Sequence, residues 1–310
     1  KGWEGLGAFD SKERKLANDL LGFKASIVFP TVAFDQVLAS KDKKVVLGGI
    51  KALNRGMSAF CQDDARLLGA AYIPFGYGED IALKFLKEAI KKGFSLILID
   101  TIAPLGAKAF THPDFDVVWR EIEEADIAVT LHVGADSSWD PIPLSFYNNG
   151  GSVPEHTAGD APRDALAYMG IQYNAEIFLA SMIFDGVFQR FPNLRVGVVE
   201  LGASWIISWM KQLDQSFRAF RRLQDLSQLK LLPSEYVLKH IKLTAFPGED
   251  IGWLLTNGAE DLMMFATDYP HHEGTDDPIS RYERTMNNIS EEVKSKFYTQ
   301  NFKQLLGSHL

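Results

Sequence analysis

The 310-residue sequence has little cysteine, no long hydrophobic run and no excess of basic residues. Cys61 is the only cysteine, which excludes an internal disulfide and makes a reducing, cytoplasmic setting the expected one. The formal net charge of -8 argues against binding to a nucleic-acid backbone. No apolar run approaches the roughly 18 to 20 residues of a membrane span, and the first residues contain no signal-peptide core. We therefore expect neither a nucleic acid nor a membrane as partner.

Short β-rich runs alternate with longer segments of helical period, and this alternation continues to the C-terminus. The pattern is typical of βα units around a parallel sheet. The runs are almost continuously apolar, which suits strands covered on both faces. Seven runs are predicted to be strands, at residues 25–30, 67–74, 95–100, 127–134, 195–200, 241–246 and 262–268.

Several intervening segments are predicted to be helices. Residues 82–90 carry apolar side chains at helical spacing and are followed by Gly93, where a helix C-cap is expected. Residues 10–21 also read as a helix, and Ser290 before two glutamates opens a final one. A long apolar stripe between Trp205 and Phe220 is explained by core packing or by the interface of a homo-oligomer.

These elements predict an α/β fold, a (β/α)8 TIM-like barrel formed by a single domain over residues 1–310. A closed barrel needs eight strands, so we expect its first strand to precede residue 1; the alternative is an open sheet. Residues 135–163 form a connection far longer than a usual βα loop. Because it follows a strand, this loop should lie on the C-terminal face of the sheet, as an active-site loop or a surface insertion.

Three predicted strands end in a side chain that can bind a metal or move a proton: His132, Glu200 and Asp268. The C-terminal ends of parallel strands lie on one rim, so we expect these side chains to converge. Imidazole and carboxylate groups are typical ligands of a catalytic divalent ion. Each residue alone has a simpler explanation, namely a hydrogen-bonded core histidine, an ion-paired glutamate or a capping aspartate. The three together favour a metal site.

Further residues are candidates for contacts with a substrate. His112 follows a strand and precedes a proline, so it either binds a substrate carboxylate or caps a helix. His271 comes three residues after Asp268 and is expected to orient that carboxylate or to touch substrate. Arg55 could pair with an anionic substrate, although a solvated helix position explains it equally. His156 is a candidate only because it lies in the long loop.

Several segments, in this order, resemble the amidohydrolase-related family of metal-dependent (β/α)8 barrels. This group includes the aminocarboxymuconate semialdehyde and hydroxybenzoate decarboxylases. The segments are "LHVGADSS", "FPNLRVGVVELGASWI", "MMFATDYPHHEG" and "FYTQNFKQLLG". The resemblance covers nearly the whole chain and indicates the fold and superfamily more specifically than the reaction.

The resemblance implies that His132 and Asp268 are metal ligands, and that Asp268 also orients or deprotonates water or substrate. His112 and His271 match recurrent family positions. Where the family often carries a histidine acid/base the chain has Glu200, which can be a base or a metal ligand but not a cationic imidazolium. The family's His-x-His or Asp-x-His motif of strand 1 is absent from the sequence. Zinc is the implied metal, while the oxygen-rich donor set also suits manganese or iron.

The sequence thus predicts a metal-dependent hydrolase or non-oxidative decarboxylase that acts on a small carboxylated or cyclic compound. Asp268 and Glu200 are its predicted catalytic residues and, with His132, its predicted metal ligands. One alternative is a barrel with a degenerate site that binds a ligand or partner without catalysis, which the absent motif of strand 1 favours. Another is an iron or manganese enzyme of the same fold with oxygen or hydratase chemistry.

Overall fold

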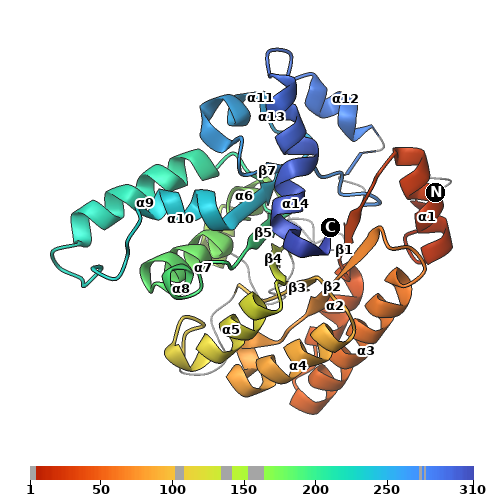
Figure 1. Cartoon of the computed structure of the whole chain (residues 1–310), viewed down its shortest axis with the longest axis horizontal. Coiled ribbons are helices and arrows are strands. Elements are labelled where there is room, and N and C mark those ends of the chain that lie inside the picture. Colours follow the sequence, from red (N-terminus) through yellow and green to blue (C-terminus); the bar gives the residue numbers. More distant parts are fainter. Residues whose placement is uncertain (1–4, 102–107, 134–141, 153–163, 272–273, 276) are drawn as a thin grey trace.

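A curled parallel sheet of seven strands organises this computed structural model, which describes residues 5–101, 108–133, 142–152, 164–271, 274–275 and 277–310 (Figure 1). The strands pair in the order in which they occur along the chain, and every neighbouring pair is parallel. The seven predicted strands are confirmed, and the described ranges contain no eighth. They are β1 (Ser26–Val28), β2 (Leu67–Tyr72), β3 (Leu96–Leu98), β4 (Ala128–His132), β5 (Val196–Val199), β6 (Ile241–Thr244) and β7 (Met263–Met264).

Helices connect consecutive strands and surround the sheet (Figure 1). The α-helices are α1 (Ser11–Leu21), α2 (Thr31–Leu38), α3 (Lys43–Cys61), α4 (Glu79–Lys91), α5 (Asp116–Glu124), α6 (Ala165–Met169), α7 (Tyr173–Phe184), α8 (Val187–Arg190), α9 (Ile206–Phe220), α10 (Pro233–His240), α11 (Ile251–Leu254), α12 (Pro278–Glu283), α13 (Glu291–Ser295) and α14 (Asn301–Leu306). Short 3-10 turns are η2 (Phe75–Tyr77), η3 (Pro113–Phe115), η4 (Leu144–Tyr147) and η7 (Gly307–His309), and π-helical turns are η5 (Leu255–Ala259) and η6 (Lys296–Gln300). No described helix has the length and apolarity to cross a membrane.

The predicted helix boundaries are confirmed where capping residues mark them. Asp10 caps α1 by accepting hydrogen bonds from the backbone of Lys12 and Glu13, and Ser290 caps α13 in the same way. Gly93 follows α4 with a φ of +80°, a left-handed conformation that suits glycine. The final helix differs from the prediction, because the π turn η6 separates α13 from α14.

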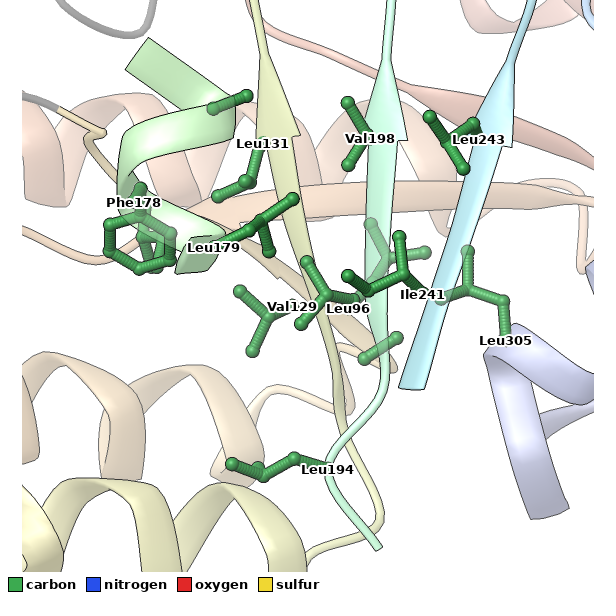
Figure 2. Packing of buried hydrophobic residues seen from close by; sticks show 14 of the residues in the cluster. Leu96, Val129, Leu131, Phe178, Leu179, Leu194, Val198, Ile241, Leu243 and Leu305 are labelled. Atoms are coloured by element: carbon green, nitrogen blue, oxygen red, sulfur yellow. The ribbon is translucent and has the colours of Figure 1, made fainter. Parts of the chain in front are cut away.

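The core is formed by apolar side chains from the strands and the helices that cover them (Figure 2). Strand residues such as Val129, Val198 and Leu243 are completely buried. Figure 2 also shows Leu305, from α14, among the clustered side chains. A Cβ atom at Gly197 would lie only 2.8 Å from Leu305 Cδ2, so glycine at this point of β5 allows α14 to approach the sheet.

His240, the last residue of α10, is a buried histidine with a structural role. Its ring stacks on Phe188 at 4.5 Å between centroids, and Nδ1 lies 2.7 Å from the carbonyl oxygen of Leu194. The carbonyl can only accept, so Nδ1 carries a hydrogen. Burial lowers the pKa of His240 from 6.5 to about 4, against the opposing effect of the hydrogen bond to Leu194.

We expect His240 to make stability depend on pH. The unfolded chain takes up this proton near pH 6.5 and the folded protein only near pH 4. The free energy of unfolding should therefore fall as the pH falls through this window, by up to about 3 kcal/mol from this residue. Urea unfolding at several pH values should give a shallower dependence for His240→Asn than for the wild type. Identical slopes would contradict this assignment.

Candidate metal centre

Four side chains at the carboxyl ends of the strands form one contiguous group, here called the rim cluster: His132, Glu200, Asp268 and His271. His132 is the last residue of β4, Glu200 follows β5 directly, and Asp268 follows β7 by four residues. His132 Nε2 lies 2.9 Å from Glu200 Oε2. His271 Nδ1 lies 3.7 Å from Glu200 Oε1 and 3.3 Å from Asp268 Oδ1. The structure brings together the three residues expected to converge and adds His271 between the two carboxylates.

The orientation of His132 is set by its other ring nitrogen. Nδ1 lies 2.7 Å from the carbonyl oxygen of Val133, so Nδ1 must be the donor. Nε2 is then the atom directed toward Glu200. The Phe29 ring packs against the imidazole at a centroid distance of 4.3 Å. A histidine that donates one N–H to a backbone carbonyl and points its other nitrogen into a site has the arrangement typical of metal-binding histidines.

Glu200 is a buried carboxylate that stays ionised. Burial by itself would raise the pKa of Glu200, but His132 and His271 together hold the pKa at about 2. Its backbone N–H donates to Thr244 Oγ1 at 3.2 Å, which ties the residue to the end of β6. An ionised carboxylate in this position is a potential base or metal ligand.

The two carboxylates of the rim cluster share an unusual backbone conformation. Glu200 has a φ of +58° and Asp268 a φ of +55°, which residues other than glycine rarely adopt. Such a conformation costs about 1 to 3 kcal/mol and is concentrated at functional sites. After Asp268, Gly274 passes so close that a Cβ atom on it would lie 2.5 Å from the Asp268 carbonyl oxygen. Tight packing therefore fixes the turn that carries Asp268.

The N-terminal segment also holds this turn. The Tyr269 hydroxyl donates to the Leu6 carbonyl oxygen at 2.9 Å. The Arg14 guanidinium, buried in α1, lies 5.8 Å from the centre of the Tyr269 ring and donates through Nε to the Gly7 carbonyl oxygen at 2.9 Å. Contacts from the start of the chain thus stabilise the residue next to Asp268.

The rim cluster contains a donor set that fits a divalent metal ion. Glu200, Asp268 and His271 each offer one ligand atom, and these atoms lie within 4.8 Å of one another. Two carboxylates and one imidazole supply the charge and the donor types that zinc, manganese or iron accepts. His132 touches this triad through Glu200. The sequence led us to expect that His271 supports Asp268 or contacts substrate. In the structure it is one of the three residues that could bind the metal.

Other candidates from the sequence lie away from the rim cluster or outside the described residues. The side chain of His112 is 44% exposed and accepts a hydrogen bond from the backbone of Asp114, so it caps η3. Arg55 is exposed on α3, and the structure does not bring it into the rim cluster. His156 lies outside the described residues, as does most of the long loop.

A buried pair on the same rim was not anticipated from the sequence. Tyr72 ends β2, and its hydroxyl lies 2.7 Å from both carboxylate oxygens of Asp100. Burial and the negative charge of Asp100 raise the pKa of Tyr72 well above its usual value. Asn54 exchanges two hydrogen bonds of 2.9 Å with the Tyr72 backbone and fixes its position. The pattern "SLILID", an apolar run that ends in aspartate, is the signal that could have identified Asp100.

We expect Tyr269→Phe to weaken metal binding although it leaves every residue of the rim cluster in place. Loss of the hydrogen bond to Leu6 should cost about 1 kcal/mol of stability and lower the affinity for zinc or manganese several-fold, because the Asp268 turn loosens. Calorimetric titration measures the affinity. Tyr298→Phe, which removes the comparable hydrogen bond to Glu283, is the matched control. Equal metal affinity of the two variants would contradict the role assigned to Tyr269.

The structure is similar to those of several known enzymes. An amidohydrolase from Mycobacterium avium subsp. paratuberculosis K-10 has a TM-score of 0.79 at 20% identity, covering 97% of this chain and 75% of its own. The 2,6-dihydroxybenzoate decarboxylase from Rhizobium has a TM-score of 0.70 at 19% identity, covering 94% and 87%. The manganese-bound 5-carboxyvanillate decarboxylase from Novosphingobium aromaticivorans has a TM-score of 0.68 at 19% identity, covering 94% and 80%. At these sequence identities, the similarities show a shared fold and not a shared reaction.

Comparison of sequences identifies the family directly. No curated protein sequence gives a significant match. The profile of the amidohydrolase family matches residues 36–307, which include all four residues of the rim cluster. The match agrees with the resemblance carried by "LHVGADSS", "VELGASW" and "DYPH". The chain therefore belongs to the amidohydrolase family.

Proposed function

We propose that the protein is a metal-dependent decarboxylase that releases CO2 without oxidation from a small, hydroxylated aromatic carboxylic acid. The observation that carries the proposal is the rim cluster, in which Glu200, Asp268 and His271 offer ligand atoms within 4.8 Å of one another. Family membership and the decarboxylases of similar fold support it. We also propose that the seven strands belong to an eight-stranded barrel, since parallel strands paired in chain order are the arrangement of that fold.

A divalent ion held by Glu200, Asp268 and His271 would supply a Lewis acid that polarises a carboxylate or phenolate oxygen of the substrate. Zinc and manganese are the proposed metals; a decarboxylase of similar fold is known with bound manganese. Nδ1 of His132 is anchored on Val133, so this ring holds Glu200 from the side opposite His271. The protein thereby fixes the direction of the Glu200 carboxylate before substrate arrives.

Decarboxylation requires a proton at the carbon that loses CO2. The carbon–carbon bond breaks, its electron pair stays on the ring carbon, and a proton from the protein forms the new C–H bond. We propose that the proton comes from water through the Asp268 carboxylate, because an imidazole nitrogen of His271 that binds the metal cannot also carry the proton. Asp268 would offer one oxygen to the metal, and its other oxygen can hold the proton and pass it on.

Hydrolysis of a cyclic substrate is the second candidate, and the identity of residue 200 favours it. The chain carries a glutamate where family members often carry a histidine acid/base. A carboxylate can take a proton from an attacking water, whereas it cannot serve as a cationic acid. In this reaction Glu200 would be the general base, and a ring C–N or C–O bond would break.

We expect Asp268→Asn and Glu200→Gln to lower the affinity for zinc and manganese at least tenfold. Each change removes the negative charge of a ligand carboxylate while keeping its shape. Calorimetric titration of chelator-treated protein measures the affinity, and Glu292→Gln, at an exposed position in α13, is the matched control. If wild-type protein binds neither zinc, manganese nor iron, the metal-dependent function is wrong.

Turnover in D2O distinguishes the two reactions. Decarboxylation of a panel of hydroxybenzoates, including 2,6-dihydroxybenzoate and 5-carboxyvanillate, should release CO2 and place one deuterium on the ring carbon that lost the carboxyl group. At saturating metal, Asp268→Asn should reduce kcat about a hundredfold or more, within the range of general acid catalysis, while Glu292→Gln at an exposed position should not. Release of an acid from lactones or amides without CO2 would favour hydrolysis instead.

A further inference from the structure

A cavity of about 230 Å³ lies at the end of the sheet opposite the rim cluster. Arg195 directly precedes β5, Lys242 is the second residue of β6, and Asp261 precedes β7, so the cavity is at the amino ends of these strands. The polar side chains around it are Arg195, Lys239, His240, Lys242, Asp261 and Gln304. Its volume is enough for several water molecules or one small ligand.

Lys242 is the buried cation of this cavity. It is only 6% exposed, and its Nζ donates to the backbone carbonyl oxygen of Asp261 at 2.5 Å. Within the described part of the chain, no carboxylate lies at ion-pairing distance from it. Burial lowers the pKa of Lys242. The Asp261 carboxylate opposes this effect, but it is itself paired with Lys296, so an anion in the cavity would further stabilise the buried ammonium group.

The other charges around the cavity are mostly compensated. Arg195 pairs with Asp126 at 2.5 Å, and the Asp261 carboxylate pairs with Lys296 at 2.8 Å. Lys239 is exposed at the mouth and adds to the positive charge of Lys242. The formal net charge of the whole chain is -8, so this local excess of positive charge is a feature of the cavity.

We propose that this cavity is a binding site for a small oxyanion of the phosphate class. Lys242 would donate to the anion from the cavity wall and Lys239 from its mouth. The amide of Gln304, on α14, can donate a further hydrogen bond. The volume suits inorganic phosphate or the phosphate group of a small monoester. The inference does not depend on the proposed function, because the rim cluster contributes no residue to this site.

Calorimetric titration of inorganic phosphate into the full chain, with chloride keeping the ionic strength constant, tests the proposal. Saturable binding in the millimolar range is expected for the wild type. Lys242→Met should weaken it at least tenfold, and Lys239→Ala, a surface change that leaves the core intact, several-fold. Lys84→Met, at an exposed position on α4, and Asp268→Asn should bind like the wild type. Phenyl phosphate, titrated in parallel, shows whether the site takes free phosphate or a monoester.

Two results would overturn the proposal. One is the absence of saturable phosphate binding to the wild type. The other is binding that is lost in Asp268→Asn but retained in both lysine variants, which would place the phosphate at the rim cluster. If circular dichroism shows that Lys242→Met is unfolded, the test rests on the phosphate affinities of Lys239→Ala and Lys84→Met. Equal affinities of these two variants would then overturn the proposal.

Discussion

The carboxylate of Glu200 is the constraint around which the candidate site is arranged. It is buried at the end of β5, and its two oxygens face two different imidazoles. A buried carboxylate is stable only if positive charge or hydrogen-bond donors surround it, so His132 and His271 must lie where they do. Asp268 then adjoins His271, and the site acquires two carboxylates in a small volume. A divalent cation is the ligand that best compensates this concentration of negative charge.

The two ends of the sheet carry opposite electrostatic character. The rim cluster gathers carboxylates at the carboxyl ends of β5 and β7, as enzymes built on parallel barrels do. The cavity at the amino ends gathers Lys239 and Lys242, while the Asp261 carboxylate in its wall is paired with Lys296. The same strands therefore connect a region suited to a metal cation with one suited to an anion. At the carboxyl end of β6, Thr244 accepts a hydrogen bond from the Glu200 backbone.

Much of the fold follows from the sequence, because strands of a parallel sheet are continuous apolar runs. All seven predicted runs are strands, and their pairing in chain order brings His132, Glu200 and Asp268 together as expected. The proximity of His271 to Asp268 was expected, but its position between the two carboxylates was not predictable. It depends on a turn whose shape needs a positive φ at Asp268 and a glycine at Gly274, and sequence spacing does not encode that geometry.

Contacts between segments that are distant in the sequence could not be predicted either. Arg14 and Tyr269 are separated by most of the chain, and only the folded structure shows that the N-terminal helix stabilises the turn beside Asp268. Tyr72 ends β2 and Asp100 follows the neighbouring strand β3 by two residues, and neither residue alone indicates the pair. Side-chain geometry of this kind depends on packing that a single sequence does not reveal.

The central claim is that the rim cluster holds a divalent metal ion. Anomalous X-ray scattering at the zinc edge, from crystals of chelator-treated protein soaked in zinc, tests it most directly. The account predicts one strong peak about 2.0 to 2.2 Å from an oxygen of Glu200, an oxygen of Asp268 and a nitrogen of His271. A fully soaked crystal with no peak among these three side chains, or with its only strong peak elsewhere, would contradict it.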